Sequence, residues 1–425
     1  MPIIGSLAGA SARGYGSFKG GAAAVSNFMT VIKSTTTSIQ GIDLLNDTDS
    51  VYFAFNDTTS QKFGALKMTK DGTTVNWNTT QDLGQYSSYN GVSKASDGNI
   101  VYSGYNNSSG RRSGRAKLNA STGAQIWSYY YDLQGYGNGG TIDGAGNIWS
   151  AQQVGSGAGL FRTDTNGDSP TMWYVNSATY CTKATYIAST NKIYGLVTGP
   201  ASTYHLTLFV LNPDGSTHWQ YEFNTNYSTD GGIVADASGN IYVATYGADS
   251  ATNGGRALLL KINSSGSLVA QKMLDGGSGT FDGFTECAID ATNGYIYAVG
   301  TGADTGLIAK YDTSLNLIWQ RRFTSGVSDL ASINLIDADN IQVVGRYTGT
   351  GGGIFTANLK TDGSGTGTYA FTGGNVVYAV STLSSTTPSI SISSPGRGIS
   401  STSPGRGNTA TINGTLTTTV QKLVI

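Results

Sequence analysis

The chain has 425 residues and a formal net charge of −1, and 12% of its residues are charged, against roughly 25% in an average globular protein. A neutral surface offers no long-range attraction to nucleic acid or to an anionic membrane, and no apolar run reaches the ~18 residues of a transmembrane helix. We therefore expect no nucleic-acid partner and no membrane insertion. With 60 Gly, 25 Tyr and two cysteines, the composition is typical of a turn-rich β-protein without a disulfide framework.

Residues 1–25 differ in composition from the rest of the chain. They are rich in Gly, Ala and Ser, with too few apolar side chains to fold alone. We interpret them as an N-terminal anchoring arm, with Arg13, Tyr15 and Phe18 as the candidate anchoring side chains. The segment also lacks the charge and apolar pattern of a signal peptide, which predicts synthesis in a reducing cytoplasm.

From about residue 38, a phrase of the form Asp-x-x-Gly-Asn followed by a β-branched and aromatic run recurs, most clearly at residues 236–247. Asp can accept hydrogen bonds from the backbone that follows it, and Gly and Asn tolerate the left-handed conformation, so the phrase predicts a tight turn and then a strand. Aligned on its central apolar residue, the repeat has copies at Val51, Ile100, Ile148, Ile193, Ile241, Ile296 and Ile341. Spacings of 45 to 55 residues suit a four-stranded propeller blade.

Each unit contains four candidate strands, for example residues 232–235, 241–245 and 257–262 in the fifth unit and 217–223 as the last strand of the fourth. Five of the six tryptophans fall at one point of the last strand: Trp77, Trp127, Trp173, Trp219 and Trp319. A large ring there can fill the wedge between neighbouring blades. The sequence therefore predicts an all-β fold, a seven-bladed β-propeller of four-stranded antiparallel blades with extended N- and C-terminal arms.

Closure of such a ring usually needs one blade to take strands from both ends of the chain. Residues 28–33 lie 22 residues before the first repeat, counted from Met29 to Val51, which is also the distance from Trp219 to Ile241. We predict that residues 28–33 form the outer strand of the last blade, with residues 366–371 as the competing candidate. The expected domains are an arm (1–25), a propeller (26–383, with a closing strand in 26–34) and a C-terminal arm (384–425).

The C-terminal arm contains two Ser-Pro-Gly-Arg-Gly copies and then alternates Thr with Ile and Val. Pro and Gly break regular structure, whereas the alternation is compatible with strands. Two interpretations stay open: an extended arm that adds strands to another subunit, and a disordered tail.

In a blade of four antiparallel strands, the turns between first and second strands and between third and fourth strands lie at one end of the ring. The connections between second and third strands and between blades lie at the other end. The connections between second and third strands and between blades vary in length, and variable loops on a repeated scaffold are where binding usually occurs. The loops between blades carry aromatic side chains, which we interpret as a binding rim for a glycan or protein on a host surface: Tyr86, Tyr89, Tyr136, Tyr180, Tyr227, Phe281 and Phe284. Packing between blades is the alternative role.

Residues suited to catalysis are few. His205 and His218 are the only histidines and have no partners at metal-ligand spacing, so we expect no metal site, no cofactor and no enzyme activity. Cys181 and Cys287 are expected to be small buried side chains. The cluster Arg111, Arg112 and Arg115 is interpreted as a solvated loop.

The repeat phrase, followed by Leu-Leu-Lys-Ile-Asn-x-x-Gly and Trp-Gln, resembles bacterial seven-bladed and quinoprotein-type propeller repeats over about residues 38–383. That resemblance implies a fold but no activity. Quinoprotein dehydrogenases carry a vicinal cysteine pair, which is absent from this sequence.

Residues 4–16 resemble the opening segment of structural proteins from tailed bacteriophages. This resemblance implies a virion protein of the tail, fibre or baseplate, with capsid decoration as an alternative and a carbohydrate-active or quinoprotein-like propeller enzyme as the competing class. The partners it implies are other virion proteins, copies of the same chain and a host-surface glycan or protein.

Overall fold

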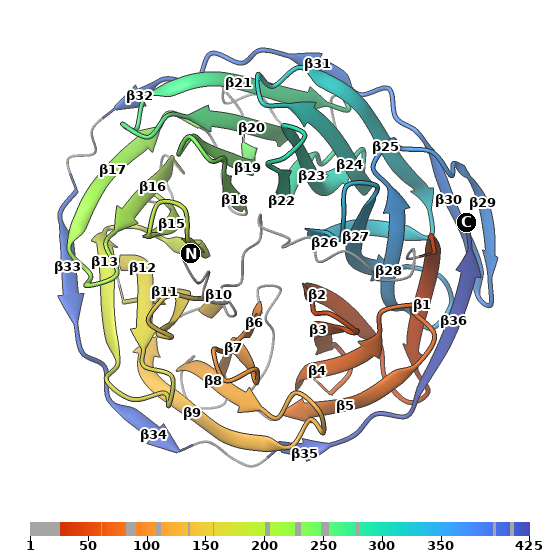
Figure 1. Cartoon of the computed structure of the whole chain (residues 1–425), viewed down its shortest axis with the longest axis horizontal. Helices are drawn as coiled ribbons and strands as arrows, with labels where there is room; N and C mark the ends of the chain where they lie inside the picture. Colours follow the sequence, from red (N-terminus) through yellow and green to blue (C-terminus); the bar gives the residue numbers. More distant parts are fainter. Residues whose placement is uncertain are drawn as a thin grey trace, which may run out of the picture.

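The computed structural model describes residues 26–60, 62–81, 91–106, 112–134, 137–155, 157–199, 205–225, 231–247, 255–277, 280–393, 397–408 and 412–425. These residues form seven antiparallel sheets arranged around a common centre (Figure 1). The described segments contain strands and no helix, and hence no helix that could cross a membrane. The predicted seven-bladed propeller is confirmed.

Each repeat forms one blade, whose strands follow one another from the centre outward. Blade 1 contains β2 (Ile39–Asn46), β3 (Ser50–Asp57), β4 (Lys62–Thr69) and β5 (Val75–Gln81); blade 2 contains β6 (Gly91–Lys94), β7 (Ile100–Asn106), β8 (Arg112–Leu118) and β9 (Gln125–Gln134); blade 3 contains β10 (Gly137–Ile142), β11 (Ile148–Val154), β12 (Gly157–Thr163) and β13 (Thr171–Asn176).

The remaining blades repeat this order. Blade 4 contains β14 (Tyr180–Ile187), β15 (Lys192–Thr198), β16 (Leu206–Leu211) and β17 (Thr217–Phe223); blade 5 contains β18 (Gly231–Ala235), β19 (Ile241–Gly247), β20 (Arg256–Ile262) and β21 (Leu268–Asp275); blade 6 contains β22 (Gly283–Asp290), β23 (Tyr295–Gly302), β24 (Thr305–Asp312) and β25 (Leu317–Ser325); blade 7 contains β26 (Val327–Leu335), β27 (Asn340–Tyr347), β28 (Gly353–Lys360) and β1 (Phe28–Ser34).

The Asp-x-x-Gly-Asn phrase forms the turn between the first and second strands, as predicted. In blade 5, Asp236 Oδ1 accepts hydrogen bonds from the backbone N–H groups of Ser238 and Asn240, both at 2.9 Å. Gly239 adopts a φ of +79°, a conformation that costs a residue without a Cβ little. The carboxylate thus satisfies the backbone donors of the turn, which allows the chain to reverse between β18 and β19.

Neighbouring blades are joined by long side chains of the third and fourth strands. In blade 1, Lys67 Nζ and Trp77 Nε1 both donate to the carbonyl of Ala120 in blade 2, at 3.1 and 3.2 Å. In blade 6, Lys310 Nζ and Trp319 Nε1 make the same pair of bonds to the carbonyl of one residue of blade 7, each at 3.1 Å. The predicted wedge of tryptophan between blades therefore also binds the next blade through hydrogen bonds.

One tryptophan departs from the predicted register. In four blades the tryptophan pairs with a residue of the third strand, and that residue pairs in turn with the one after the aligned apolar residue in the second strand. These four are Trp77, Trp127, Trp219 and Trp319. Trp173 instead pairs with Leu160, two residues along the strand, and its ring stacks on Trp149 with centroids 5.3 Å apart. The expectation of one common register was wrong for blade 3, because its turn between β12 and β13 places Thr171, not Trp173, opposite Arg162.

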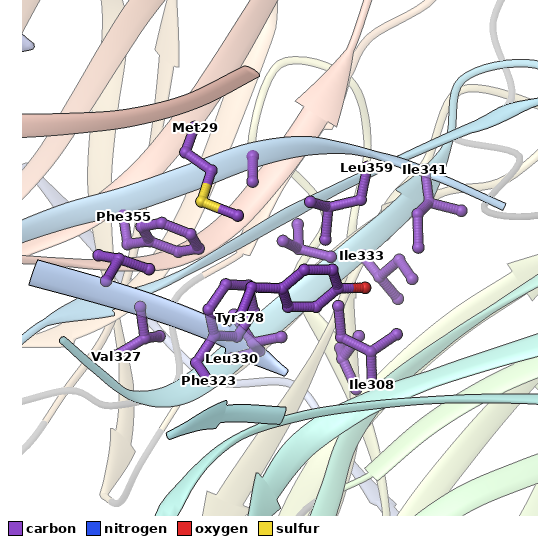
Figure 2. Close-up of a cluster of buried hydrophobic side chains, with 14 of the residues drawn as sticks. Met29, Ile308, Phe323, Val327, Leu330, Ile333, Ile341, Phe355, Leu359 and Tyr378 are labelled. Carbon is purple, nitrogen blue, oxygen red and sulfur yellow. The ribbon is translucent and has the colours of Figure 1, made fainter. Parts of the chain in front are cut away.

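Strand β1 closes the ring as the fourth strand of blade 7, which confirms the blade predicted for residues 28–33. It is not the outermost strand of that sheet, because β36 pairs with its other edge. Five residues of β1, from Phe28 to Ile32, pair with β28. From β1, the side chain of Met29 packs with Phe323, Phe355 and Tyr378 in a buried cluster shared by blades 6 and 7 (Figure 2). Residues 366–371, the competing candidate, belong largely to β29 (Gly367–Phe371), which lies on blade 6.

The described C-terminal residues form a belt around the ring, defined here as residues 367–393, 397–408 and 412–424. After the hairpin of β29 and β30 (Gly374–Val380) on blade 6, the belt adds one outer strand to each further blade: β31 (Ser384–Thr386) on blade 5, β32 (Ile392–Ser393) on blade 4, β33 (Ile399–Thr402) on blade 3, β34 (Arg406–Asn408) on blade 2, β35 (Ile412–Gly414) on blade 1 and β36 (Thr418–Val424) on blade 7. It travels against the order of the blades and appears as the blue outer trace in Figure 1. The repeat's four strands thus sit inside five- and six-stranded sheets.

The belt pairs with this chain's own blades, a third arrangement beside the two that the sequence analysis left open. The residue after the tryptophan position has an amide side chain in blades 1 and 5, and this side chain binds the belt backbone at residues that lie between the belt strands. Gln271 exchanges two hydrogen bonds with the backbone of Ile390, at 3.2 and 3.1 Å, and Asn78 exchanges two with Leu416, at 2.9 and 2.7 Å. Two hydrogen bonds from one amide fix both the position and the direction of the bound backbone.

The two Pro-Gly-Arg-Gly copies supply further contacts to the belt. Arg397 Nη2 lies 3.0 Å from Glu222 Oε2 on β17. Arg406 forms an ion pair with Asp168, and its guanidinium lies 4.2 Å from the ring centroid of Tyr129 on β9. Each copy therefore places one arginine on an acidic side chain of the ring.

Both ends of the described chain meet at one corner of blade 7. Asn27 Nδ2 donates to Asn340 Oδ1 at 3.1 Å, beside the turn between β26 and β27, and the backbone N–H of Ile425 donates to the Asn27 carbonyl at 3.2 Å. This corner lies on the turn face, the end of the ring that carries the Asp-x-x-Gly-Asn turns. The opposite end is the loop face, which carries the connections between blades and between second and third strands.

Candidate functional site

The structure describes only part of the predicted aromatic rim. Tyr86, Tyr89, Tyr136 and Tyr227 lie outside the described residues, as do Arg13, Tyr15 and Phe18 of the arm. Tyr180 is the first residue of β14 and is half-buried. Phe281 lies on the loop face just before β22, and 45% of its surface is exposed.

The inclusion of Phe284 in the rim was wrong. It is fully buried between blades, and its ring meets Tyr311 edge-on with centroids 6.5 Å apart. Its position within β22 explains this outcome, because both faces of that strand are covered by neighbouring blades and seven of its eight residues are buried.

On the loop face, Phe281 pairs with an aromatic residue that sequence reasoning missed. Its ring stacks on Tyr246, at the end of β19, with centroids 4.7 Å apart and 17° between the planes. Tyr246 belongs to the repeat phrase itself, so its sequence position gave no sign of the pairing. We refer to Tyr246 and Phe281 as the aromatic stack.

At the centre of the ring, equivalent positions of the first strands carry polar residues or glycine. Each of these inner-ring positions pairs with the same residue of the second strand, the fourth when counted from the aligned apolar residue of the repeat. The positions are Asp43, Gly91, Asn138, Lys183, Gly232, Glu286 and Ser332. A β-bulge precedes Asp43, Lys183, Glu286 and Ser332, and a bulge displaces one backbone N–H from the ladder.

The two inner-ring carboxylates have corresponding roles. Asp43 Oδ1 accepts from the N–H of the next residue, Leu44, at 2.9 Å, as Glu286 Oε1 does from Cys287 at 3.1 Å. Asp43 also accepts from Ser332 Oγ of blade 7 at 2.8 Å and from the Val92 N–H of blade 2 at 3.0 Å. Asp43 therefore links three blades at the centre.

The other carboxylate, Glu286, forms a buried ion pair with Lys183. The pair joins blades 4 and 6 across blade 5, and the two side chains are 2% and 10% exposed respectively. The pair can form because blade 5 has Gly232 at its inner-ring position, where any side chain would collide with the Glu286 carboxylate. The sequence carried no local sign of this contact between residues 103 positions apart.

The histidines have structural surroundings, as expected. His205 Nδ1 lies 2.9 Å from Glu222 Oε1, on the carboxylate that also binds Arg397 of the belt. The ring of His218 lies against Trp219, with centroids 6.4 Å apart. Burial lowers the pKa of His218 below its usual value, with a further contribution from Lys192, so it is largely neutral at neutral pH.

The expectation for Arg115 was wrong. It lies within β8, is fully buried, and donates to the carbonyls of Ile148 and Phe161 at 3.0 and 2.8 Å and to the hydroxyls of Ser150 and Thr163. Its guanidinium is 4.1 Å from the Phe161 ring centroid. Burial lowers its pKa to about 10. Four neutral acceptors and an aromatic face hold the charge and join blades 2 and 3.

Among the described residues, no group of three or more His, Cys, Asp or Glu side chains could hold a metal ion. Cys181 and Cys287 are both buried in the core, as predicted, and neither forms a disulfide. Burial raises the pKa of the Cys181 thiol to about 12, so it is not a thiolate at neutral pH and is poorly suited to act as a nucleophile.

Neither comparison by sequence finds a match: no protein-family model and no curated protein matches the chain. Solved structures are similar in fold. Hydrazine synthase from Kuenenia stuttgartiensis is 12% identical over 71% of this chain and 91% of its own, with a TM-score of 0.52. The β-propeller domain of the trilobed protease from Pyrococcus furiosus is 10% identical (77% and 98% covered, TM-score 0.44), and dihydro-haem d1 dehydrogenase is 11% identical (93% and 78%, TM-score 0.45).

These similarities concern the fold alone. A propeller fold by itself indicates no activity, because one fold can serve enzymes and binding proteins alike.

Proposed function

We propose that this protein is a non-enzymatic structural component of a tailed bacteriophage particle. In this proposal, residues 1–25 anchor it to the tail, fibre or baseplate, and its loop face points outward to the host surface. The arm would bind other virion proteins, and copies of the chain would lie side by side on the particle, which is assembled in the host cytoplasm.

The observation that carries the proposal is the polarity of the propeller. Residues 1–25 join β1 through Asn27, which binds Asn340 on the turn face. The variable connections and the aromatic stack lie at the opposite end. A protein held by its arm would therefore present the loop face away from the attachment point.

Three further features support this role. The ring is closed by β1 and by the belt, as a particle exposed outside the cell requires. Residues 4–16 resemble the opening segment of structural proteins from tailed bacteriophages. Four side chains of the inner ring are engaged in joining blades: Asp43, Lys183, Glu286 and Ser332.

The test is deletion of residues 1–25 in the phage that carries this protein. We expect the truncated propeller to keep its melting temperature and to be missing from purified particles. A full-length Arg13→Ala, Tyr15→Ala, Phe18→Ala variant should also be depleted, because these residues would supply the anchoring contacts. Normal incorporation of both variants would contradict the proposal.

Labelling of intact particles with an antibody against the propeller distinguishes a location on the tail, fibre or baseplate from a location on the head. Label on the tail, fibre or baseplate supports the proposal, and label spread over the head assigns capsid decoration instead. Purified particles without any label, combined with turnover of a sugar or alcohol substrate by the free protein, would favour the enzyme class.

A further inference from the structure

We infer that the aromatic stack is a binding platform for a neutral hexose residue of a surface glycan. The inference rests on the proposed function in one respect, since it takes the loop face as the outward face. It adds the ligand class and the residues that would recognise it.

The lower ring of the stack is fixed in place. Tyr246 is packed closely by two glycines, Gly255 and Gly283, where any side chain would collide with or press against the tyrosine. Phe281 covers the tyrosine ring, and 45% of the phenylalanine remains exposed. The described residues thus build a stack of two rings whose outer member is still open to solvent.

The loop that carries Phe281 is held by the neighbouring hairpin. Asp282 is fully buried, and its carboxylate accepts from the N–H of Ala303 at 2.6 Å and of Gly276 at 2.7 Å. In return, Asp304 Oδ1 accepts from the Phe281 N–H at 3.1 Å. The backbone N–H of Phe281 and the side chain of the next residue are therefore held before any ligand arrives, which lowers the entropy cost of binding.

The bracing hairpin has an unfavourable backbone. Ala303 and Asp304 form the two-residue turn between β23 and β24 with φ values of 45° and 61°, where Asn-Gly is the usual sequence. The left-handed conformation costs an alanine about 1 kcal/mol. Strain of this kind is typical of ligand-binding sites, and here it places the Asp304 carboxylate against the Phe281 backbone.

The chemistry around the open ring favours a sugar. The C–H bonds on one face of a pyranose carry partial positive charge and pack on the negative face of an aromatic ring, as edge-on aromatic hydrogens do. Sugar hydroxyls around that face can donate to exposed carboxylates. Asp304 is exposed beside Phe281, and Asp275, which binds Arg256 at 2.9 Å, ends the strand before this loop.

The charge of the loop narrows the class further. The described loop and its bracing hairpin carry Asp275, Asp282 and Asp304 against one cation, Arg256. Carboxylates repel uronic and sialic acids but leave uncharged hexoses unaffected. A neutral hexose is therefore the ligand that combines an apolar face with hydroxyl donors and no negative charge.

Saturation-transfer difference NMR on the full chain tests the platform with methyl α-D-glucoside, -galactoside and -mannoside as probes and methyl glucuronide as the charged comparison. We expect transfer to the C–H protons of one pyranose face for at least one neutral probe, and a weaker signal from the glucuronide. Phe281→Ala should weaken binding about tenfold, and Phe281→Trp should preserve it.

Ile318→Ala is the matched control, because Ile318 is a similarly exposed apolar residue, 51% exposed, but lies on β25, outside the aromatic stack. The inference fails if no neutral probe shows transfer to folded protein, if Phe281→Ala binds as well as the native chain, or if the glucuronide binds more strongly. Attachment to host cells that survives periodate but not protease would assign a protein ligand and also overturn it. Particle incorporation of Phe281→Ala is expected to be normal, so failure here is separate from failure of the arm's anchoring role.

Discussion

The propeller is closed at its centre and at its rim by contacts of opposite kinds. At the centre, a few buried polar side chains such as Asp43 and the Lys183–Glu286 pair join blades that are far apart in sequence. At the rim, the exposed belt joins all seven sheets through short strands of ordinary backbone hydrogen bonds. The contacts that hold the blades together at the centre therefore depend on individual side chains, whereas those on the outside of the ring depend on one continuous segment of the chain.

Removal of residues 418–425 should have the largest effect. These residues include β36, whose seven residues pair with β1 along its whole length. Since a ladder hydrogen bond contributes about 1 kcal/mol net, we expect the free energy of unfolding to fall by about 5 kcal/mol in urea denaturation. The exposed edge of β1 should also cause self-association in light scattering. Unchanged stability would mean that the belt's last strand does not close the ring.

Breaking the inner ion pair should rank second. Glu286→Ala leaves the buried Lys183 ammonium without its partner, which costs about 4 kcal/mol in comparable buried pairs. The double variant Lys183→Met, Glu286→Ala removes both charges and should recover most of that loss, as measured by the same denaturation experiment. Equal instability of the single and double variants would show that the cavity, not the unpaired charge, is responsible.

The smallest effect should come from one belt contact. Gln271→Ala removes two hydrogen bonds to the backbone of the buried Ile390, and we expect a loss of about 2 kcal/mol because each bond contributes about 1 kcal/mol net. Amide exchange of Ile390 should accelerate while that of Ile241 in the core of blade 5 stays slow. Global acceleration would contradict the view that single rim contacts act locally.

Much of the fold could be predicted because each blade repeats its own local signals. The Asp236 turn and the spacing of residues 28–33 before Val51 are statements about neighbouring residues, and the structure confirms both. Trp173 shows the limit of this reasoning, because one altered turn moved it two positions along its strand.

The belt and the inner ring could not be predicted in the same way. Strands such as β31, with three residues, acquire their conformation from the sheet edge that they join, so their sequence carries little strand signal. The Trp-Gln phrase did contain a usable sign, since the amide after the tryptophan position binds the belt in blades 4, 5 and 6.

The candidate site was predicted only as a region. The loop face and Phe281 follow from strand order and composition, whereas Tyr246 and Arg115 acquired their roles through contacts between blades. Such contacts depend on how the sheets pack, which no local pattern records.

The position of β1 has a mechanical consequence. If residues 1–25 anchor the protein and the loop face binds a host surface, as proposed, a pull between the two ends runs along the axis of β1, which lies between β28 and β36 and is antiparallel to both. Force in that direction shears the two ladders, so their hydrogen bonds resist together instead of breaking one after another. The last belt strand, β36, therefore adds a second ladder that must be sheared before β1 can leave blade 7.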